Sequence, residues 1–157
     1  MDLGQVMLAV GAGERSQSFA LFSEQIDPQW IGQALQATGT ATVRLLINAQ
    51  QAMEGQSGSV KIATRLAQGD QIEIQVHDTG PGIPEEIQAK IFEPFFTTKP
   101  VGKGTGLGLS VSYGIVKNHK GDIRVESGAG QGATFTISLP AAKAPEVAAV
   151  AGDKGSP

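Results

Sequence analysis

The chain has 157 residues, of which 40% are hydrophobic, and this is enough for one domain with one core. Its 12 Lys and Arg residues against 15 Asp and Glu residues give a mildly acidic balance, which does not favour binding to nucleic acid or to an anionic membrane surface. The absence of cysteine excludes disulfides, thiol nucleophiles and cysteine-based metal sites. Any anionic ligand must therefore be held by local features.

No apolar run reaches the length of a transmembrane helix, and the N-terminus lacks the basic segment and apolar core of a signal peptide. We therefore expect a cytoplasmic location without direct membrane contact. Residues 141–157 consist largely of Ala, Gly, Pro, Lys and Glu. This composition predicts a disordered tail or linker after a domain that spans residues 1–140.

Glycines interrupt every amphipathic helix that could be placed in the first 40 residues, so short strands and one helix are expected there. A clearer helix is predicted over residues 40–55, because apolar residues repeat at i, i+1, i+4, i+7 and i+8. Gly55 ends this helix, and Asn48 lies at the flank of the apolar stripe. The stripe consists of Leu45, Leu46, Ala49, Ala52 and Met53.

Four β-strands are predicted from alternating apolar residues, and they form two hairpins linked at residues 68–70 and 127–132. The alternating residues are Val60, Ile62 and Thr64, then Ile72, Ile74 and Val76, then Ile123 and Val125, then Phe135, Ile137 and Leu139. Between the hairpins, Pro84 opens a short helix to about Phe92, and residues 105–118 form a longer helix closed by Gly121.

This order of elements differs from the strand and helix alternation of a doubly wound parallel sheet. It predicts an α+β fold, a two-layer α/β sandwich in which a mixed, largely antiparallel sheet is covered by helices on one face.

Two segments rich in glycine carry candidate chemistry. Residues 78–82, Asp-Thr-Gly-Pro-Gly, follow a strand end, although such residues are also common in ordinary turns. Residues 102–110 place four glycines at alternate positions before a helix, where unpaired backbone N–H groups favour a phosphate. The spacing is neither that of a Walker loop nor that of a dinucleotide-binding fold, so those two phosphate-binding classes are disfavoured.

A third segment, residues 91–99, holds half of the six phenylalanines and breaks at Pro94. It could pin a loop to the core, or it could form a mobile lid that uses its aromatic residues to dock on a partner.

Taken in this order, these segments resemble the ATP-binding catalytic domain of sensor histidine kinases. This family belongs to the ATPase group that also contains gyrase, the heat-shock chaperone of ninety kilodaltons and the mismatch-repair ATPases. Residues 45–49 resemble the family's asparagine box, residues 78–82 the first glycine box, residues 92–96 the phenylalanine box and residues 104–109 the second glycine box. The resemblance covers about residues 45–140, and residues 1–40 match poorly. It implies the Bergerat-type ATP-binding fold.

The resemblance also implies roles for the matching residues. Asp78 would accept a hydrogen bond from the adenine amino group, worth ~1.5–3 kcal/mol, and Thr134 would support the adenine site through water. Gly80 and Gly82 would leave room for the purine ring. The further nucleotide contacts implied are Ile83, Phe92, Gly104, Thr105, Gly106, Leu107, Gly108 and Leu109.

The phosphates and their metal would lie at the other end of the same site. Asn48 would ligate Mg²⁺ through its side-chain oxygen, because Mg²⁺ binds a few protein oxygens together with phosphate and water. Lys99 and Lys103 would neutralise the γ-phosphate. Asn48, Lys99 and Lys103 are therefore the implied catalytic residues, and ATP and Mg²⁺ are the implied ligands.

Arg44 departs from the family pattern, because it stands four residues before Asn48, where the family usually has a second asparagine. An arginine can neither act as a base at neutral pH nor ligate a cation. It could instead contact a phosphate directly, or mark a site with weakened Mg²⁺ binding. Gln51 also stands near a position where the family often has a lysine.

Neither histidine has the surroundings of a phosphoacceptor. His77 is expected to be a solvated residue at an outward-facing strand position, and His119 is expected to cap or pack at a helix end. The acceptor is therefore expected on a separate dimerisation and phosphoacceptor domain, with a response regulator as the indirect partner.

Two functions from different classes follow. The first is transfer of the γ-phosphoryl group of ATP to that histidine, in which catalysis is mostly positioning and charge neutralisation. The second is a nucleotide-sensing or docking module without kinase activity. ATP hydrolysis of the gyrase type is disfavoured, because Arg44 stands where gyrase-like ATPases have a catalytic glutamate. An anti-sigma serine kinase is disfavoured by the phenylalanine segment. A monomer is expected, since dimerisation in the family belongs to the helical domain.

Overall fold

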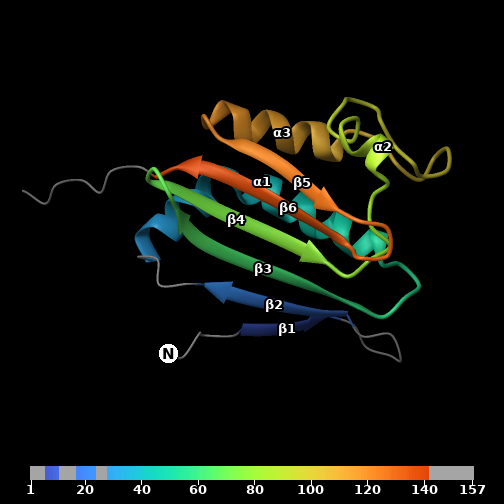
Figure 1. Ribbon diagram of the computed structural model, residues 1–157, viewed down its shortest axis with the longest axis horizontal. Helices are drawn as coiled ribbons and strands as arrows, with labels where there is room; N and C mark the ends of the chain where they lie inside the picture. The colour runs from blue at the N-terminus through green and yellow to red at the C-terminus, as the bar shows by residue number, and fades with distance from the viewer. Residues whose placement is uncertain (1–5, 11–16, 24–27, 142–157) are drawn as a thin grey trace, which may run out of the picture.

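The computed structural model describes residues 6–10, 17–23 and 28–141, with side chains described from residue 36 onward. This part of the chain forms six strands and three helices (Figure 1). In chain order they are β1 (Val6–Val10), β2 (Gln17–Ser23), α1 (Pro28–Ala52), β3 (Gly58–Ala67), β4 (Gln71–Asp78), α2 (Glu85–Gln88), α3 (Gly108–Asn118), β5 (Asp122–Ser127) and β6 (Ala133–Pro140).

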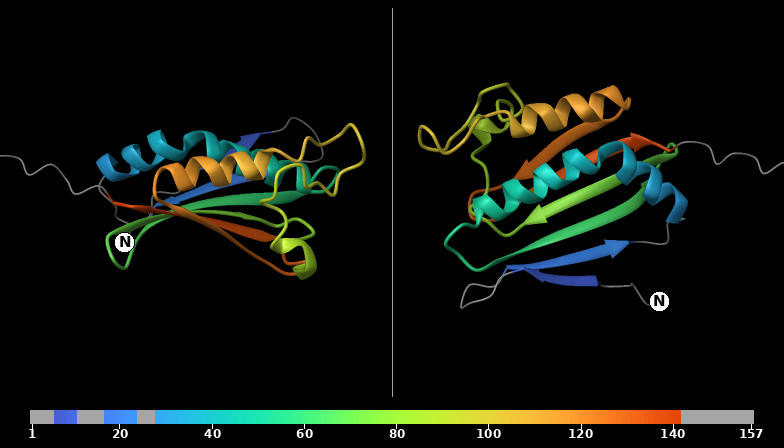
Figure 2. Two further views of the ribbon diagram at one scale, coloured as in Figure 1. Left: turned by 90° about the horizontal axis from the view of Figure 1, so that it is seen from above. Right: turned by 180° about the vertical axis from the view of Figure 1, so that it is seen from behind.

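The strands form one mixed sheet in the order β1-β2-β3-β4-β6-β5. Only the β2–β3 pair is parallel, and the other neighbours are antiparallel. The helices α1 and α3 lie side by side over one face of this sheet (Figure 2). The predicted α+β two-layer architecture with a largely antiparallel sheet is therefore confirmed.

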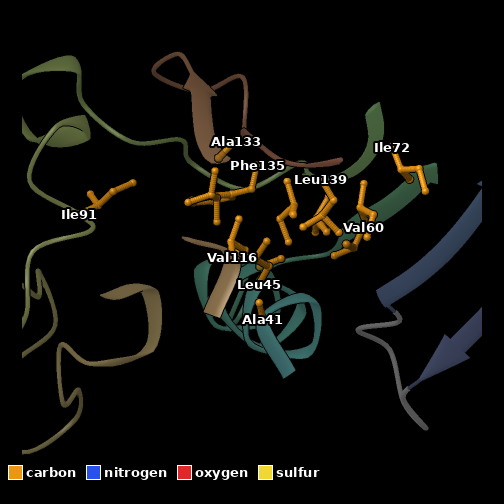
Figure 3. Close-up of a cluster of buried hydrophobic side chains, with 14 of the residues drawn as sticks. Ala41, Leu45, Val60, Ile72, Ile91, Val116, Ala133, Phe135 and Leu139 are labelled. Atoms are coloured by element: carbon orange, nitrogen blue, oxygen red, sulfur yellow. The ribbon is translucent and has the colours of Figure 1, made fainter. Parts of the chain in front are cut away.

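The core lies between this sheet and the two long helices (Figure 3). The cross-strand pair of Ile74 and Ile137 at its centre is fully buried, and Leu45 of α1 and Val116 of α3 close it from the helix side. Paired residues project from the same side of the sheet. The alternation predicted for these strands is thus the one that buries the sheet against the helices.

The helix predicted from residue 40 begins earlier, because α1 starts at Pro28 and contains both Gly32 and Gly39. A methyl group at Gly39 would meet no atom within 4 Å, so this position lies in open space. The glycines lower helix propensity, but tertiary packing overrides propensity when one face is buried. The buried stripe also differs from the prediction, since Thr38 and Ala41 extend it while Ala52 is exposed.

The two other helices are shorter than predicted. α2 is a single turn over Glu85–Gln88, followed by turns up to Phe92. α3 begins at Gly108 rather than at Thr105, because the preceding Gly106 has a φ of +66°, which a right-handed helix does not accommodate. His119 ends α3, where its Nδ1 lies 2.9 Å from the carbonyl oxygen of Ile115.

The predicted tail falls outside the described residues except for Ala141, whose N–H donates to the carbonyl of Asp70 at 2.7 Å. Within the described part of the chain, no helix is both long enough and apolar enough to cross a membrane.

The sheet face opposite the helices carries a buried carboxylate. Glu73 of β4 is 5% exposed, and it accepts hydrogen bonds from Arg65 Nε at 2.6 Å and from Arg124 Nη2 at 3.1 Å. Burial on its own raises the pKa of Glu73, but the hydrogen bonds and charges of the two arginines outweigh it, so the pKa lies below its ordinary value. This network ties β3 and β5 together across β4 and β6.

We predict that Glu73→Gln lowers the free energy of unfolding at pH 7 by about 1.5–3 kcal/mol, the range for hydrogen bonds to charged groups. A depressed folded-state pKa stabilises the fold above the unfolded-state pKa, and this stabilisation is lost as the pH falls through the folded-state pKa. The difference in unfolding free energy between wild type and Glu73→Gln, measured by urea denaturation, should therefore shrink below pH 4.5, the ordinary pKa of a glutamate side chain. Glu126→Gln is the control, since its side chain is 75% exposed and its carboxylate approaches Arg124 Nε only to 3.8 Å. A gap that stays constant down to pH 3 would contradict this assignment.

Candidate functional site

A cavity of about 890 Å³ lies at the end of the sheet where β4 and α1 end. Its walls come from the second half of α1, the loop after β4 together with α2, the loop between α2 and α3, and the start of α3 (Figure 1). The lining residues on these elements come from segments far apart in the sequence. Such a concave site, formed where several segments meet, is typical of small-molecule binding.

The α1 wall presents Arg44, Asn48 and Gln51, which are spaced at i, i+4 and i+7 and so share one face of the helix. Leu45, Ala49 and Met53 on the neighbouring face are buried. The side chain of Asn48 faces the first residue of α3, since a methyl group at Gly108 would lie 3.9 Å from its Oδ1 atom.

The opposite wall is the glycine segment that leads into α3. Gly104, Thr105, Gly106, Gly108 and Leu109 line the cavity. An α-helix start leaves its first N–H groups without intrahelical partners and carries a partial positive charge. This wall therefore suits an anion with several oxygen acceptors.

The glycine segment is held by a backbone contact with the phenylalanine segment. The Phe95 N–H donates to the Gly106 carbonyl at 2.9 Å, and both residues have positive φ, +68° for Phe95 and +66° for Gly106. A methyl group at Gly106 would lie 2.4 Å from the Phe95 carbonyl carbon. Only glycine allows this approach, so the two loops are fixed against each other here.

The third wall is the loop after β4. Pro81, Gly82 and Ile83 line the cavity, and the Ile83 N–H donates to Ser127 Oγ at 2.7 Å. Gln88 Nε2 of α2 donates to the carbonyls of Ile83 at 2.8 Å and of Ser127 at 3.1 Å. The loop is therefore docked on the turn between β5 and β6.

Asp78 lies just before this loop and is 3% exposed. One of its carboxylate oxygens accepts the Gly80 N–H at 2.9 Å. Neither residue is among those that line the cavity, whereas Ala52, which lies next to Gly80, is among them. The carboxylate thus lies behind the cavity surface, near Ala52 of the α1 wall.

The segment between Phe95 and Gly104 closes the cavity from the remaining side. Lys99 and Lys103 both line it, and the Lys99 ammonium donates a hydrogen bond to Gln51 Oε1 on α1. The Lys99 N–H also donates to Thr97 Oγ1 at 3.1 Å. This segment is therefore connected to α1 across the cavity.

Most of the residues predicted for the site converge on this cavity. Those that line it are Asn48, Gly82, Ile83, Lys99, Lys103, Gly104, Thr105, Gly106, Gly108 and Leu109. Leu107 is not among the lining residues, and it is 37% exposed.

Phe92 and Thr134 are placed elsewhere. The Phe92 ring packs against Phe135 at 6.4 Å and Tyr113 at 5.8 Å between ring centroids. Thr134 pairs with His77 on the sheet face away from the helices, and its Oγ1 lies 2.8 Å from His77 Nδ1. Successive strand residues point to opposite faces, so Asp78 faces the helix side and its cross-strand neighbour is Ala133. The structure does not bring Thr134 to the cavity. His77 is partly buried by the same contact, so it is not simply solvated.

Several lining residues were not predicted as site residues. The apolar ones lie on α1, in the loop after β4, on α2 and in the phenylalanine segment, and only the packing of these elements in the fold brings them together. They are Ile47, Ala52, Pro81, Pro84, Ile87, Ile91 and Phe96. Gln51 could have been found from its position three residues after Asn48. The others are Arg44, Thr97, Thr98 and Gly102.

The charges of the cavity fit a polyphosphate. Among the described residues that line it, Arg44, Lys99 and Lys103 are cationic and none is a carboxylate. Within the described part of the chain, no cluster of three or more His, Cys, Asp or Glu side chains could hold a metal ion by itself. Asn48 offers an amide oxygen, so Mg²⁺ fits here only together with phosphate oxygens.

Comparison with known proteins identifies similar chains. Residues 36–143 match the family described as histidine kinase-, DNA gyrase B- and HSP90-like ATPase. The chain is 46% identical to the sensor kinase CckA of Brucella abortus over 112 residues, which are 62% of this chain and 12% of that protein. It spans 11–23% of the length of the curated relatives it matches first.

Solved structures show the same fold. The catalytic domain of the histidine kinase ThkA matches with a TM-score of 0.58 and 36% identity over 68% of this chain and 67% of that chain. Full-length ShkA in complex with AMPPNP matches with a TM-score of 0.62 and 30% identity, over 69% of this chain and 22% of that chain.

We predict that Gly106→Ala destabilises the protein more than Gly102→Ala. Both glycines have positive φ, +66° and +86°, so both substitutions cost roughly 1–2 kcal/mol of backbone strain. A methyl group at Gly102 meets no atom within 4 Å, whereas at Gly106 it meets the Phe95 backbone, which should add about 1–3 kcal/mol. Chemical denaturation of the two variants measures the difference. Equal losses would show that the Phe95 contact does not constrain the loop.

Proposed function

The chain belongs to the histidine kinase-, DNA gyrase B- and HSP90-like ATPase family, as the ATP-binding catalytic domain of a sensor histidine kinase, and we propose that it transfers the γ-phosphoryl group of ATP to a histidine of a separate domain. The observation that carries this proposal is the cavity between Asn48 and the start of α3, which three cations line without a carboxylate. A nucleoside triphosphate is a ligand that suits both the apolar and the cationic walls.

In this proposal the base of ATP lies at the end of the cavity near β4. Asp78 accepts a hydrogen bond from the adenine amino group. A carboxylate has acceptor capacity for about four hydrogen bonds, so the bond from Gly80 leaves room for this one. Ile83, Ile87 and Ile91 supply an apolar wall for the purine. Guanine presents an acceptor where adenine has its amino donor, so the site should discriminate between them.

The phosphates then extend towards α3. The backbone N–H groups of residues 104–108 donate to phosphate oxygens at the helix start. Lys99 and Lys103 neutralise the γ-phosphate, and for this Lys99 exchanges its hydrogen bond with Gln51 for one with phosphate. Asn48 would hold Mg²⁺, and the bound ion would supply positive charge next to the phosphates. These residues bind and orient the nucleotide, while the nucleophile comes from the acceptor domain.

We propose as partners the histidine-containing dimerisation domain of a parent kinase and, through it, a response regulator. The relatives that the chain matches include sensor kinases and a two-component sensor. The chain in isolation should be a monomer, because the proposed dimer contacts belong to that other domain. Residues 1–140 form the proposed catalytic domain.

A second function is favoured by Arg44, which lines the cavity one helical turn from Asn48. If its charge excludes Mg²⁺, the domain could bind nucleotide as a sensing or docking module without transferring phosphate. Binding measurements fit both functions, so only a transfer assay separates them.

The test is phosphorylation in trans of a dimeric acceptor domain, taken from a close relative, by the purified chain with Mg·ATP. We expect acid-labile phosphohistidine on the acceptor, and we expect Asp78→Asn to lose most transfer together with ADP binding. Loss of a hydrogen bond to a charged group lowers affinity by about 10- to 100-fold. Glu126→Gln, on the far sheet face, is the matched control.

Adenine-specific binding without transfer to any of several acceptor domains would favour the docking module. Absence of nucleotide binding at millimolar concentration would refute both functions.

A further inference from the structure

Arg44 is a charged side chain whose hydrogen bonding is incomplete. Its Nε atom is buried, and it has no hydrogen-bond partner in the described part of the chain. The residue lies in the middle of α1 and lines the cavity. A buried donor of a charged group without a partner is costly. Such a cost at a cavity wall suggests that the guanidinium completes its hydrogen bonds with a ligand.

The position of Arg44 places this charge near the proposed phosphate end. Asn48 is one helical turn further along α1, and its side chain faces Gly108 at the start of α3. The described carboxylates closest in sequence to the cavity loops do not line it. They are Asp78, Glu85, Glu86 and Glu93. No carboxylate of the described cavity wall therefore competes with a ligand for Arg44.

The chemistry of the arginine side chain indicates which ligand groups it can bind. The guanidinium is always charged, has five N–H donors in a planar fork and cannot ligate a cation. It binds phosphate oxygens in a bidentate manner. A cation one helical turn from Asn48 also disfavours Mg²⁺ at Asn48 by direct repulsion. The same side chain therefore strengthens phosphate binding while it weakens the contribution of Mg²⁺ to nucleotide affinity.

We infer that Arg44 binds phosphate oxygens of the nucleotide directly and gives this site a component of nucleotide affinity that does not depend on Mg²⁺. The inference rests on the proposed function, because it concerns the phosphate end of the same cavity. It assigns to Arg44 a role in binding and in metal dependence, and it does not assign to it a role in proton transfer.

The experiment is calorimetric titration of the full chain with ADP, once with Mg²⁺ and once with EDTA. Wild type should keep ADP binding in EDTA with a loss below about tenfold. Arg44→Asn should weaken ADP binding in EDTA by about 10- to 100-fold, the factor for hydrogen bonds to a charged group. Arg44→Lys, which keeps the charge without the planar fork, should fall between the two.

Two controls separate phosphate contact from a structural role. Adenosine lacks phosphate, so its affinity should be the same in wild type and in Arg44→Asn. Lys120→Asn removes a cation from an exposed position beyond α3 that does not line the cavity. Lys120 has a φ of +58°, which asparagine tolerates. ADP binding by Lys120→Asn should change by less than about twofold, because distant exposed charges are screened.

The outcomes are distinct. If Arg44→Asn binds ADP in EDTA as well as wild type does, or better, the inference is overturned. An equal loss of adenosine and ADP affinity would also overturn it, since Arg44 would then act through the fold. If Asp78→Asn loses ADP binding while Arg44→Asn keeps it, only the inference fails. If wild type binds no adenine nucleotide under either condition, the proposed function fails first.

Discussion

The burial of one stripe of α1 fixes the position of every polar group on that helix. Leu45, Ala49 and Met53 are held against the sheet with at most 4% exposure, so the rotation of α1 about its axis is set by the core. The adjacent face, which carries Arg44 and Asn48, then has to face the cavity. The chemistry of the cavity therefore depends on apolar packing that makes no contact with a ligand. A substitution in this stripe would turn the polar face as well as weaken the core.

The remaining walls depend on loops that are fixed by backbone contacts. The loop after β4 is tied to Ser127 through the N–H of Ile83 and through Gln88. Phe95 adopts a left-handed conformation, which costs roughly 1–2 kcal/mol for a residue with a side chain, and its bond to Gly106 helps to hold it there. Strain of this kind is concentrated at functional sites. The positions of these loops are thus set by contacts within the protein itself.

The sequence was sufficient for the four strands β3, β4, β5 and β6, because alternation of apolar residues reports directly which strand face is buried. It failed at the start of α1, where the glycines lower local propensity and only tertiary packing sustains the helix. Thr134 could have been placed correctly, since Phe135, Ile137 and Leu139 were predicted to face inward and their even-numbered neighbour must face outward. The position of Phe92 at the edge of the core, against Tyr113 and Phe135, required knowledge of how α3 packs on the sheet, which no local pattern contains.

The proposed function requires that the phosphates of a bound nucleotide lie between α1 and the start of α3. Amide NMR spectra of the isotope-labelled chain, recorded during titration with Mg·AMPPNP, test it most directly. We expect the largest shift changes on residues 80–83 and 104–109 and on the side-chain amide of Asn48, while residues of the far sheet face such as Glu73 and Thr136 stay unchanged. Shift changes that centre on the far face, or none at saturating nucleotide, would contradict it.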